Sequence, residues 1–426
     1  MPPQSWGCPR RVQEAEKRWR VRVFPHLRRR WRPGPKNGKF SHAESAHLGG
    51  RLVHLSHLEL RHFRNLGSQE LEIPPQGLAL VGDNAHGKSN FLEAIYYLET
   101  FRSFRGAPDE QLVELGEEVF LVAGTQGGEA ARPRAVTAAY QKRGKRKKVT
   151  VDGAEPDRLG DALGSIAAVV FSPADVTLVS GGPTERRRYL DIVLSLNVPG
   201  YLRALQHFRH VLSQRNAALR DQSRSPELVR AWDDGLVRWG ARVLCERRAW
   251  VEERCGAFRA LYETVGGPGQ SAALRYAPGV PLDGAGSEDD VAAAYRSALE
   301  ASADRESRQG STVVGPHRDD LVVSLDAAAG TLDARDFGSG GQWRTAALAL
   351  RLVEARTIRD RRGRAPLMLV DDVFSELDEG RSERALALLE QEETGQVILT
   401  APKQSDVRLR RDALPRWRIA AGRISA

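Results

Sequence analysis

Cysteine, lysine and long apolar runs are all scarce in this 426-residue sequence. The three cysteines, Cys8, Cys245 and Cys255, are too widely spaced for a zinc knuckle, and their scarcity fits a reducing cytoplasm. No window approaches the roughly 18–20 consecutive apolar residues that a membrane-spanning helix needs. We therefore expect a soluble cytoplasmic protein without a membrane partner.

Positive charge, by contrast, is abundant. The formal net charge is +9 and the isoelectric point is near 9.7, values that favour a polyanionic partner without identifying it. Part of the excess lies in residues 1–50, which are rich in arginine and have no sustained apolar period, so we expect this segment to be disordered. A basic DNA-binding arm and a mitochondrial-type presequence are both compatible with it. We favour a third explanation, a dispensable tail or a mis-annotated start ahead of a true start near Leu52.

The strongest motif runs from Gly82 to Ser89 and has the pattern G-x-x-x-x-G-K-S of a phosphate-binding P-loop. It lies between an apolar stretch at 78–81, as in a buried strand, and a predicted helix with apolar residues on one face. The glycines permit a tight turn whose backbone N–H groups surround a triphosphate. The nucleotide-binding residues that we predict are Gly82, Asp83, Asn84, Ala85, His86, Gly87, Lys88, Ser89 and Asn90. In such a loop Lys88 reaches the β- and γ-phosphates, and the Ser89 hydroxyl completes the Mg²⁺ shell.

A basic hairpin is predicted further along, with strands at 135–140 and 149–151 and a turn at 141–148. Contact with DNA phosphates needs charge rather than fixed geometry, so this turn is a candidate DNA contact. An ordinary solvated turn would have the same composition. The candidate residues are Lys142, Arg143, Lys145, Arg146, Lys147 and Lys148.

Between residues 173 and 311 the sequence takes on a helical period. Apolar residues recur at three- and four-residue steps over 201–212 and 228–243, which predicts helices packed into a lobe of their own. A segment rich in glycine and proline at 266–286 separates them from a shorter helix near 291–302. No heptad run is long enough for an extended coiled coil.

The last third returns to alternating strands and helices and carries two further candidate sites. Residues 366–370 predict a buried strand that delivers Asp371 and Asp372 at its end, where a carboxylate can organise Mg²⁺. A second anion-binding device precedes a strong helix and consists of Ser339, Gly340, Gly341 and Gln342. The predicted fold class is α/β, with a nucleotide-binding domain in residues 51–172 and 312–426 and an inserted helical lobe in residues 173–311.

Two anion-binding devices are more than one γ-phosphate requires. The combination resembles the ABC-type ATPase head of Rad50- and SMC-like proteins, in which the second device serves the nucleotide held by the other protomer. Within that superfamily the chain from about Leu52 onward resembles the RecF family of bacterial recombination-mediator ATPases. Besides the P-loop, the motifs that carry this resemblance are Phe63-Arg64-Asn65-Leu66, Ser103-Phe104-Arg105, Phe171-Ser172-Pro173, Glu185-Arg186-Arg187-Arg188 with Asp191, Gln214-Arg215-Asn216, Gly315-Pro316-His317-Arg318-Asp319-Asp320 and residues 371–378.

The sequence departs from the expected motifs at a few positions. Ala85 stands where the family usually has glycine, and Ser89 replaces the more usual threonine but keeps the hydroxyl. Thr400 occupies the place of a histidine found in many ABC ATPases. We cannot assign the glutamine equivalent to the ABC Q-loop.

The resemblance implies an ATP-dependent DNA-binding clamp, associated with the nucleoid. Two chains would enclose ATP and Mg²⁺, with Lys88 on the phosphates, Ser89 and Asp371 on the metal, Asp372 orienting water, and Ser339 on the partner's γ-phosphate. The clamp would bind double-stranded DNA or ssDNA–dsDNA junctions at gaps and stalled forks, and promote RecA loading with RecO and RecR. Weak, DNA-stimulated ATP hydrolysis would reset it. The alternatives are the ATP-binding subunit of an ABC transporter, with a much shorter helical subdomain, and a coiled-coil cohesion or break-repair head.

Overall fold

The computed structural model of the chain describes residues 54–128, 131–221, 226–327, 330–372, 377–391, 395–403 and 414–426. The predicted extension at residues 1–50 therefore lies outside the described residues, as do residues 373–376 of the motif that follows Asp372. The element positions reported below belong to the unit Gly50–Ala426.

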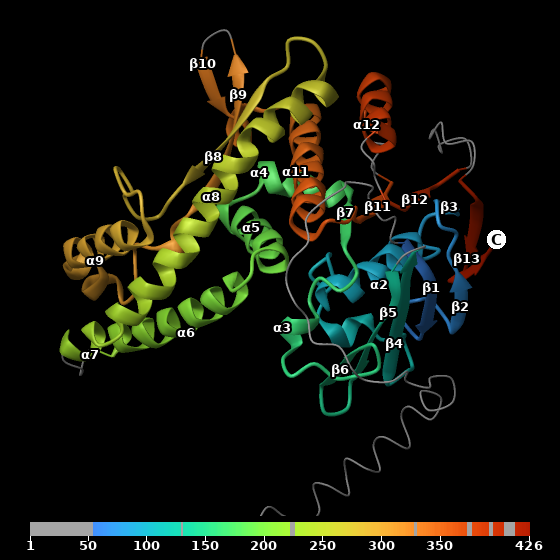
Figure 1. Cartoon of the computed structure of the whole chain (residues 1–426), viewed down its shortest axis with the longest axis horizontal. Helices are drawn as coiled ribbons and strands as arrows, with labels where there is room; N and C mark the ends of the chain where they lie inside the picture. The colour runs from blue at the N-terminus through green and yellow to red at the C-terminus, as the bar shows by residue number, and fades with distance from the viewer. Residues whose placement is uncertain are drawn as a thin grey trace, which may run out of the picture. The chain divides into compact units, whose positions relative to one another are not determined.

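A six-stranded sheet carries the predicted strands of the nucleotide-binding domain (Figure 1). The strand order is β14-β13-β3-β12-β11-β7, and β3, β12, β11 and β7 run parallel to their neighbours. Every residue of these four strands is buried, as expected for a parallel sheet that is covered on both faces. The predictions at 78–81, 168–171, 366–370 and 396–400 are therefore confirmed. The bounds are β3 Gly77–Val81, β7 Ala168–Phe171, β11 Leu367–Asp371, β12 Val397–Ala401, β13 Arg416–Ala420 and β14 Arg423–Ser425.

A second, antiparallel sheet has the order β2-β1-β4-β5-β6. Its bounds are β1 His54–Arg61, β2 Gln69–Glu72, β4 Val119–Gly128, β5 Ala131–Gln141 and β6 Arg146–Val151. The predicted basic hairpin exists, but its turn is shorter than expected, because Gln141 pairs with Arg146. Gly144 and Lys145 both have positive φ and close this turn. Three of the six candidate DNA-contacting cations, Arg146, Lys147 and Lys148, therefore belong to a strand.

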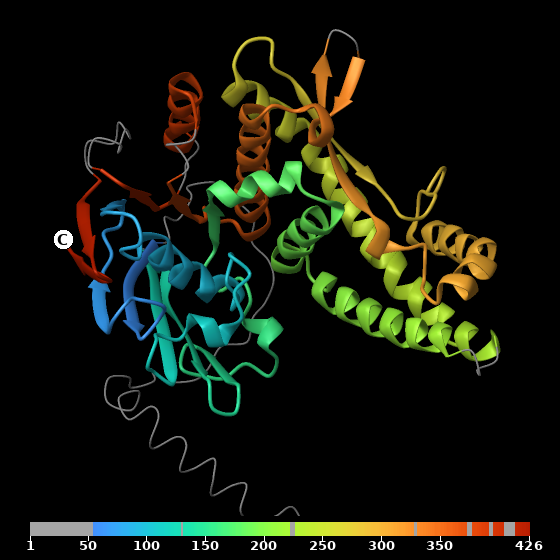
Figure 2. The same ribbon diagram turned by 180° about the vertical axis from the view of Figure 1, so that it is seen from behind.

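The helix that follows the P-loop, α2 (Lys88–Thr100), packs between the two sheets, as the views from both sides show (Figures 1 and 2). Its apolar residues join side chains of β1, β4, β3 and β11 in one hydrophobic cluster. The predicted apolar face is present, but Glu93, Tyr97 and Glu99 on other faces are buried as well. The sequence pattern alone understates the burial because it does not show that a second sheet covers this helix.

Helices dominate residues 173–311 as predicted, and a short helix, α3, precedes them. Their bounds are α3 Leu159–Ala162, α4 Thr177–Ser180, α5 Pro183–Asn197, α6 Tyr201–Arg220, α7 Pro226–Arg230, α8 Asp233–Gly266 and α9 Glu288–Gln309. The predicted helix over 228–243 is interrupted at Ala231 and Trp232, which form a turn between α7 and α8. The helix near 291–302 is longer than predicted and begins at a capping box in which Ser287 and Asp290 satisfy each other's backbone N–H groups.

A small third sheet, with the order β10-β9-β8, was not predicted in full. Its strands are β8 Ala272–Ala277, β9 Asp320–Ala327 and β10 Gly330–Asp333. The prediction of a strand at 321–325 is confirmed by β9, whereas β8 lies in the segment that we expected to be a separator. Because β8 pairs with β9, the segments predicted as helical lobe and as nucleotide-binding domain share this sheet.

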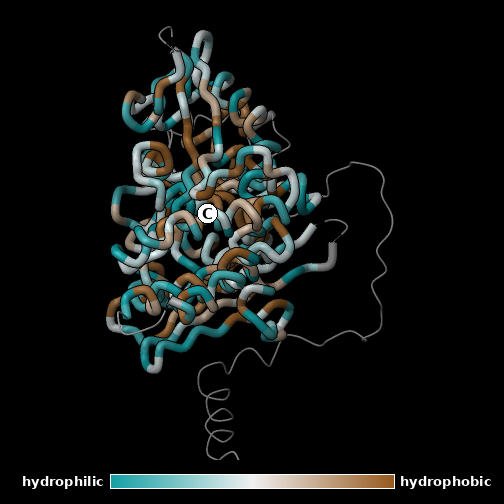
Figure 3. The backbone as a smooth tube through the Cα atoms, turned by 90° about the vertical axis from the view of Figure 1, so that its left-hand side faces the viewer, coloured by the Kyte–Doolittle hydropathy of each residue, from teal (hydrophilic) through white to brown (hydrophobic). Residues whose placement is uncertain are grey.

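The remaining helices are α10 Ala334–Phe337, α11 Gly340–Arg362 and α12 Glu379–Gln391. Helix α11 packs on α8 and β7, and its buried residues join those of α5, α8 and β9 in a second cluster. In Figure 3 the hydrophobic stretches gather inside the trace, and hydrophilic ones occupy many loops and outer turns. Across the described residues, no helix combines the length and apolarity that crossing a membrane requires.

Candidate nucleotide-binding site

The P-loop connects the end of β3 to the start of α2. Ala85 and Gly87 have φ of 68° and 107°, so the chain turns sharply before the helix begins. Lys88, the first helical residue, is 7% exposed, and its Nζ donates to the carbonyl oxygens of Gly82 (2.6 Å) and Asp83 (3.0 Å). Asp83, Asn84 and Ala85 are exposed along the loop, and His86 is half-buried. The loop therefore encloses an ammonium group and remains accessible, as phosphate binding requires.

Residues next to the loop form a hydrogen-bonded chain at its outer side. Asn90 Nδ2 donates to Asn65 Oδ1 (2.8 Å), and Asn90 Oδ1 accepts from Arg105 (3.2 Å). Beneath them, Arg64 makes a bidentate pair with Glu93 at 3.0 Å for both nitrogens, and Ser103 donates to the same carboxylate. The motifs Phe63–Leu66 and Ser103–Arg105 thus meet at the P-loop helix. A buried carboxylate that is paired in this way fixes the backbone segments around it.

Ser89 and Asp371 lie together, as predicted. The Ser89 hydroxyl donates to Asp371 Oδ1 at 2.9 Å, and Thr400 Oγ1 donates to the same oxygen at 2.9 Å. Asp371 is the last residue of β11, and Thr400 lies opposite it in β12. Thr400 thus takes part in the site by orienting the carboxylate.

The donor set suits Mg²⁺, which prefers hard oxygen ligands and usually keeps several water molecules. A hydroxyl and one carboxylate are sufficient protein ligands when phosphate oxygens complete the shell. Within the described part of the chain no group of three or more His, Cys, Asp or Glu side chains could hold a metal by itself. The Ser89 hydroxyl and the Asp371 carboxylate fit a cation that arrives with a nucleotide.

Asp372, the predicted water-orienting residue, has an unusual backbone. Its φ is 49°, in the left-handed region that aspartate tolerates better than most residues but that still costs about 1 kcal/mol. It directly follows the carboxylate that pairs with Ser89. Such strain is concentrated at functional positions, which supports a specific role for this residue.

The second anion-binding device begins α11. Ser339 is the N-cap: its hydroxyl accepts from Gln342 N (3.3 Å), and Gln342 Oε1 accepts from Ser339 N (2.8 Å). Ser339 and Gly340 are exposed, and Gly341 is half-buried. Among the described residues the structure gives no hydrogen bond between this device and the P-loop. Within one chain, no hydrogen bond of the described residues therefore joins the two predicted sites.

Arg381 in α12 is a neighbour of this device that the sequence did not indicate. A Cβ on Gly341 would lie 2.2 Å from Arg381 Nη1, so the guanidinium lies directly against this glycine. Asp378 orients the guanidinium at 3.1 Å. The helix start therefore has a cation beside its N–H groups, which strengthens its attraction for an anion.

The six candidate DNA-contacting cations differ in their surroundings. Lys147 pairs with Asp109 at 2.7 Å and donates to Phe101 O, and Lys148 pairs with Glu155 at 2.5 Å. Lys142 Nζ donates to Glu117 O. Arg143, Lys145 and Arg146 are exposed at the turn, with Lys145 Nζ 3.9 Å from Glu110. The exposed cations of the hairpin are therefore these three residues.

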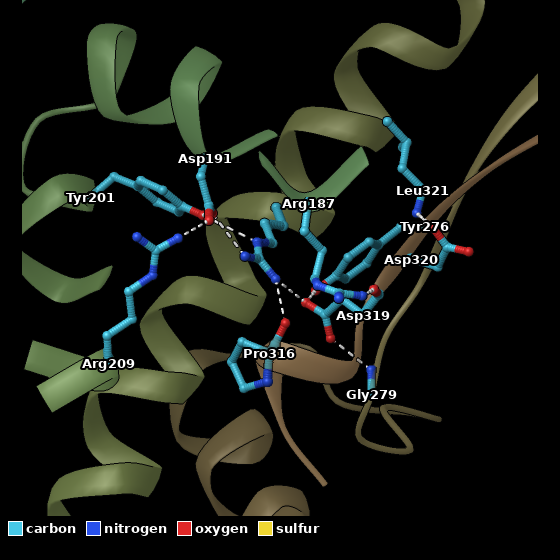
Figure 4. Close-up of polar contacts among 11 residues, drawn as sticks. Arg187, Asp191, Tyr201, Arg209, Tyr276, Gly279, Pro316, Asp319, Asp320 and Leu321 are labelled. Carbon is cyan, nitrogen blue, oxygen red and sulfur yellow. Dashed lines mark hydrogen bonds and ion pairs between the residues drawn. The ribbon is translucent and has the colours of Figure 1, made fainter. Parts of the chain in front are cut away.

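A buried ion-pair network joins several of the family motifs (Figure 4). Arg247 of α8 is 2% exposed and donates to Asp191 (2.7 Å), Asp319 (2.6 Å) and the carbonyl of Pro316 (2.7 Å). Tyr276 donates to Asp319 as well. Burial raises the pKa of Asp319, and the adjacent Arg247 opposes this rise. The network ties α5, α8, β8 and the 3₁₀ turn Pro316–Arg318 together.

Arg247 and Tyr276 were missed because neither belongs to a recognisable motif. Arg186, five residues before Asp191 in α5, pairs with Asp320 through its Nε (2.7 Å) and Nη2 (2.9 Å). Burial lowers the pKa of His317 to about 4, so the ring is neutral near pH 7 and its Nε2 donates to Thr312 O (3.0 Å). These contacts give a structural role to two of the family motifs, Glu185–Arg188 and Gly315–Asp320.

Comparison with known proteins identifies the family of this chain. A family model described as the RecF/RecN/SMC N terminal domain matches residues 54–414. The DNA replication and repair protein RecF of Chloroflexus aggregans is 38% identical over 376 residues, which cover 83% of this chain and 94% of that protein. A solved structure of the recombination mediator protein RecF-ATPrS in the RecFOR pathway has a TM-score of 0.80 at 30% identity, covering 89% of this chain and 99% of that one.

A solved Smc head domain from Pyrococcus furiosus, with an extended coiled coil and bound to the C-terminal domain of ScpA, is also similar. Its TM-score is 0.51 at 18% identity, over 88% of this chain and 95% of that one, a likeness of fold alone. The predicted resemblance and the predicted fold class are both confirmed by these comparisons. The chain belongs to the RecF family and has the fold of an ABC-type ATPase head.

Proposed function

We propose that this chain binds and slowly hydrolyses ATP. The observation that carries the proposal is the hydrogen bond from Ser89 to Asp371, which joins the P-loop to the end of β11. Lys88 would bind the β- and γ-phosphates through its ammonium group, and Ser89 and Asp371 would hold Mg²⁺, which would neutralise phosphate charge. Asp372 would orient the attacking water. The remaining residues of the loop, from Gly82 to Asn90, would form the turn whose backbone N–H groups surround the phosphates.

The same proposal makes the active form a homodimer. Ser339 and Gly340 are exposed at the N-terminus of α11, and no described contact brings them to the P-loop of the same chain. An exposed helix N-terminus with Arg381 beside it suits the γ-phosphate of a nucleotide held by a second copy. Ser339, Gly340, Gly341 and Gln342 would thus complete the site of the partner protomer. In this arrangement residues 51–172 and 312–426 form the ATPase domain, and residues 173–311 form the helical lobe.

The relatives are DNA replication and repair proteins, and the similar solved structure belongs to a recombination mediator of the RecFOR pathway. We extend this role to the present chain: an ATP-dependent clamp on double-stranded DNA or ssDNA–dsDNA junctions. It would act in the cytoplasm with RecO and RecR to promote RecA loading at gaps and stalled forks. DNA would stimulate its weak ATPase activity, and hydrolysis would reset the clamp. Membership of the RecF family favours this function over a transporter subunit.

The mass of the protein in solution provides the test. We expect a monomer without nucleotide and a dimer with ATP and Mg²⁺. The protein should be retained on duplex DNA only when ATP and Mg²⁺ are present. Measurements with ADP, and with ATP in the presence of a chelator, serve as controls. ATP binding without any change of mass would contradict the dimer, and DNA retention independent of nucleotide would contradict the clamp.

A further inference from the structure

The β13–β14 hairpin lies against the phosphate-binding loop. Strand β13 pairs in parallel with β3, the strand that leads into the loop, with Trp417 opposite Leu80 and Arg418 opposite Val81. Trp417 and Ile419 are buried in the same cluster as Phe91 and Leu92 of α2. A Cβ on Gly82 would lie 2.4 Å from Ile419 O, so the loop begins in direct contact with this strand.

The turn of the hairpin, at Ala421 and Gly422, is hydrogen-bonded to the loop itself. Gly422 N donates to His86 O at 3.1 Å. Gln69 of β2 holds the turn from the other side: its Nε2 donates to Gly422 O (2.9 Å), and its Oε1 accepts from Ile424 N (3.1 Å). The turn is therefore fixed between the antiparallel sheet and the P-loop.

Close packing makes this position specific for glycine. Gly422 has φ of +77°, and a Cβ there would lie 1.8 Å from Asn65 O. The side chain of Asn65 in turn donates to Ala85 O at 3.3 Å. A Cβ on Gly87 would lie 2.8 Å from Asn65 Oδ1. Gly422 thus packs directly against Asn65, and Asn65 packs directly against the loop.

These contacts determine which way the peptide groups of the loop face. The carbonyls of Ala85 and His86 are both occupied by donors outside the loop. A peptide plane whose carbonyl is held on one side presents its N–H to the opposite side. Phosphate binding depends on N–H groups that point inward. We propose that the Ala421–Gly422 turn is a positioning element of the ATP site, which holds the peptide after His86 in the orientation that phosphate binding needs.

The test is the substitution Gly422→Ala in the full chain, and it rests on the ATP binding proposed above. We expect the Kd for a labelled ATP analogue to rise roughly tenfold, because one oriented hydrogen bond and the packing behind it are lost. In steady-state ATP hydrolysis, KM should rise by a similar factor with little change in kcat, since binding of the ground state and the transition state weakens equally.

Gly153→Ala is the matched control. Gly153 has φ of +80°, and nothing lies within 4 Å of its added Cβ. Both glycines have a similar positive φ, so the destabilisation that alanine causes at such a φ should appear in both variants, whereas the close approach to Asn65 occurs in Gly422→Ala. We expect Gly153→Ala to bind ATP as tightly as the unmodified chain does.

Gln69→Ala is a second, independent variant, because it releases the turn without adding an atom near the P-loop. We expect it to weaken ATP binding several-fold, and it decides the question by itself if Gly422→Ala does not fold. Folded variants that bind ATP as tightly as the unmodified chain would overturn the positioning role. An unmodified chain that binds no ATP would instead overturn the proposed function.

Discussion

Ser89 and Asp371 are separated by 282 positions in the sequence, and their side chains share a 2.9 Å hydrogen bond. Because β11 and β3 both pair with β12 in parallel, their carboxyl ends reach the same edge of the sheet. The hydroxyl after the P-loop lysine and the carboxylate after β11 are thus placed side by side.

Lys88→Met should weaken ATP binding ten- to hundredfold, because a buried ammonium group that meets the phosphates is lost. Dimer formation and DNA retention should disappear with it. Calorimetric titration with ATP measures the effect. Lys145→Met, which removes an exposed lysine from the basic turn, is the control for charge and should bind ATP normally. Unchanged affinity in Lys88→Met would refute the P-loop assignment.

Ser339→Arg should leave ATP binding by the monomer intact and prevent dimerisation. The serine is exposed at the start of α11 and would meet the nucleotide of the second copy, where an arginine is too large to fit. Analytical ultracentrifugation with and without ATP gives the mass, and fluorescence titration gives the monomer affinity. A large loss of monomer affinity would mean that Ser339 acts within its own chain.

The basic hairpin offers an exposed set and a paired set of cations for a DNA-binding test. Neutralising the exposed Arg143, Lys145 and Arg146 together should weaken DNA binding and reduce its salt slope by up to about 2.7, or 0.9 for each phosphate contact. Neutralising Lys147 and Lys148, which pair with Asp109 and Glu155, should change the slope less and lower stability. If both variants bind DNA with the original slope, the hairpin is a solvated turn.

Asp372→Asn should trap the ATP-bound dimer on DNA. The amide keeps the shape of the carboxylate but cannot act as a base, whereas closure requires the γ-phosphate rather than its cleavage. DNA dissociation rates in excess ATP and Mg²⁺ should therefore fall at least tenfold. Asp326→Asn, which removes a carboxylate on β9 that pairs with Arg259, provides the control. Equal dissociation rates for Asp372→Asn and the unmodified chain would mean that ATP hydrolysis does not control release from DNA.

Arg247→Met should destabilise the protein by about 3–5 kcal/mol, because it leaves Asp191 and Asp319 buried without their shared cation. Urea unfolding at neutral pH measures the change in free energy. Arg209→Met removes another partner of Asp191, but this arginine is 61% exposed, so the expected cost is below about 1 kcal/mol. Equal costs for the two variants would contradict the central position of Arg247.

The local elements around the site could be predicted because each is encoded in one short run of sequence. Strand β3, the P-loop and α2 follow one another directly, and their apolar periods change from strand to helix across the glycines. The capping residues Ser339 and Gln342 mark the start of α11 in the same way. The strand β8 was missed because it has six residues and lies among glycines and prolines.

The sequence by itself determined the P-loop, the buried strands of the parallel sheet, the helical character of residues 173–311 and the family resemblance, because these depend on residue type and local spacing. The tertiary structure alone decided which distant groups meet: Ser89 with Asp371, Arg247 with Asp191 and Asp319, and Gly422 with His86. It also decided that Lys147 and Lys148 are paired inside the chain. The physical reason is that burial, ion pairing and close packing depend on which segments fold against each other, and residue spacing along the chain does not specify this.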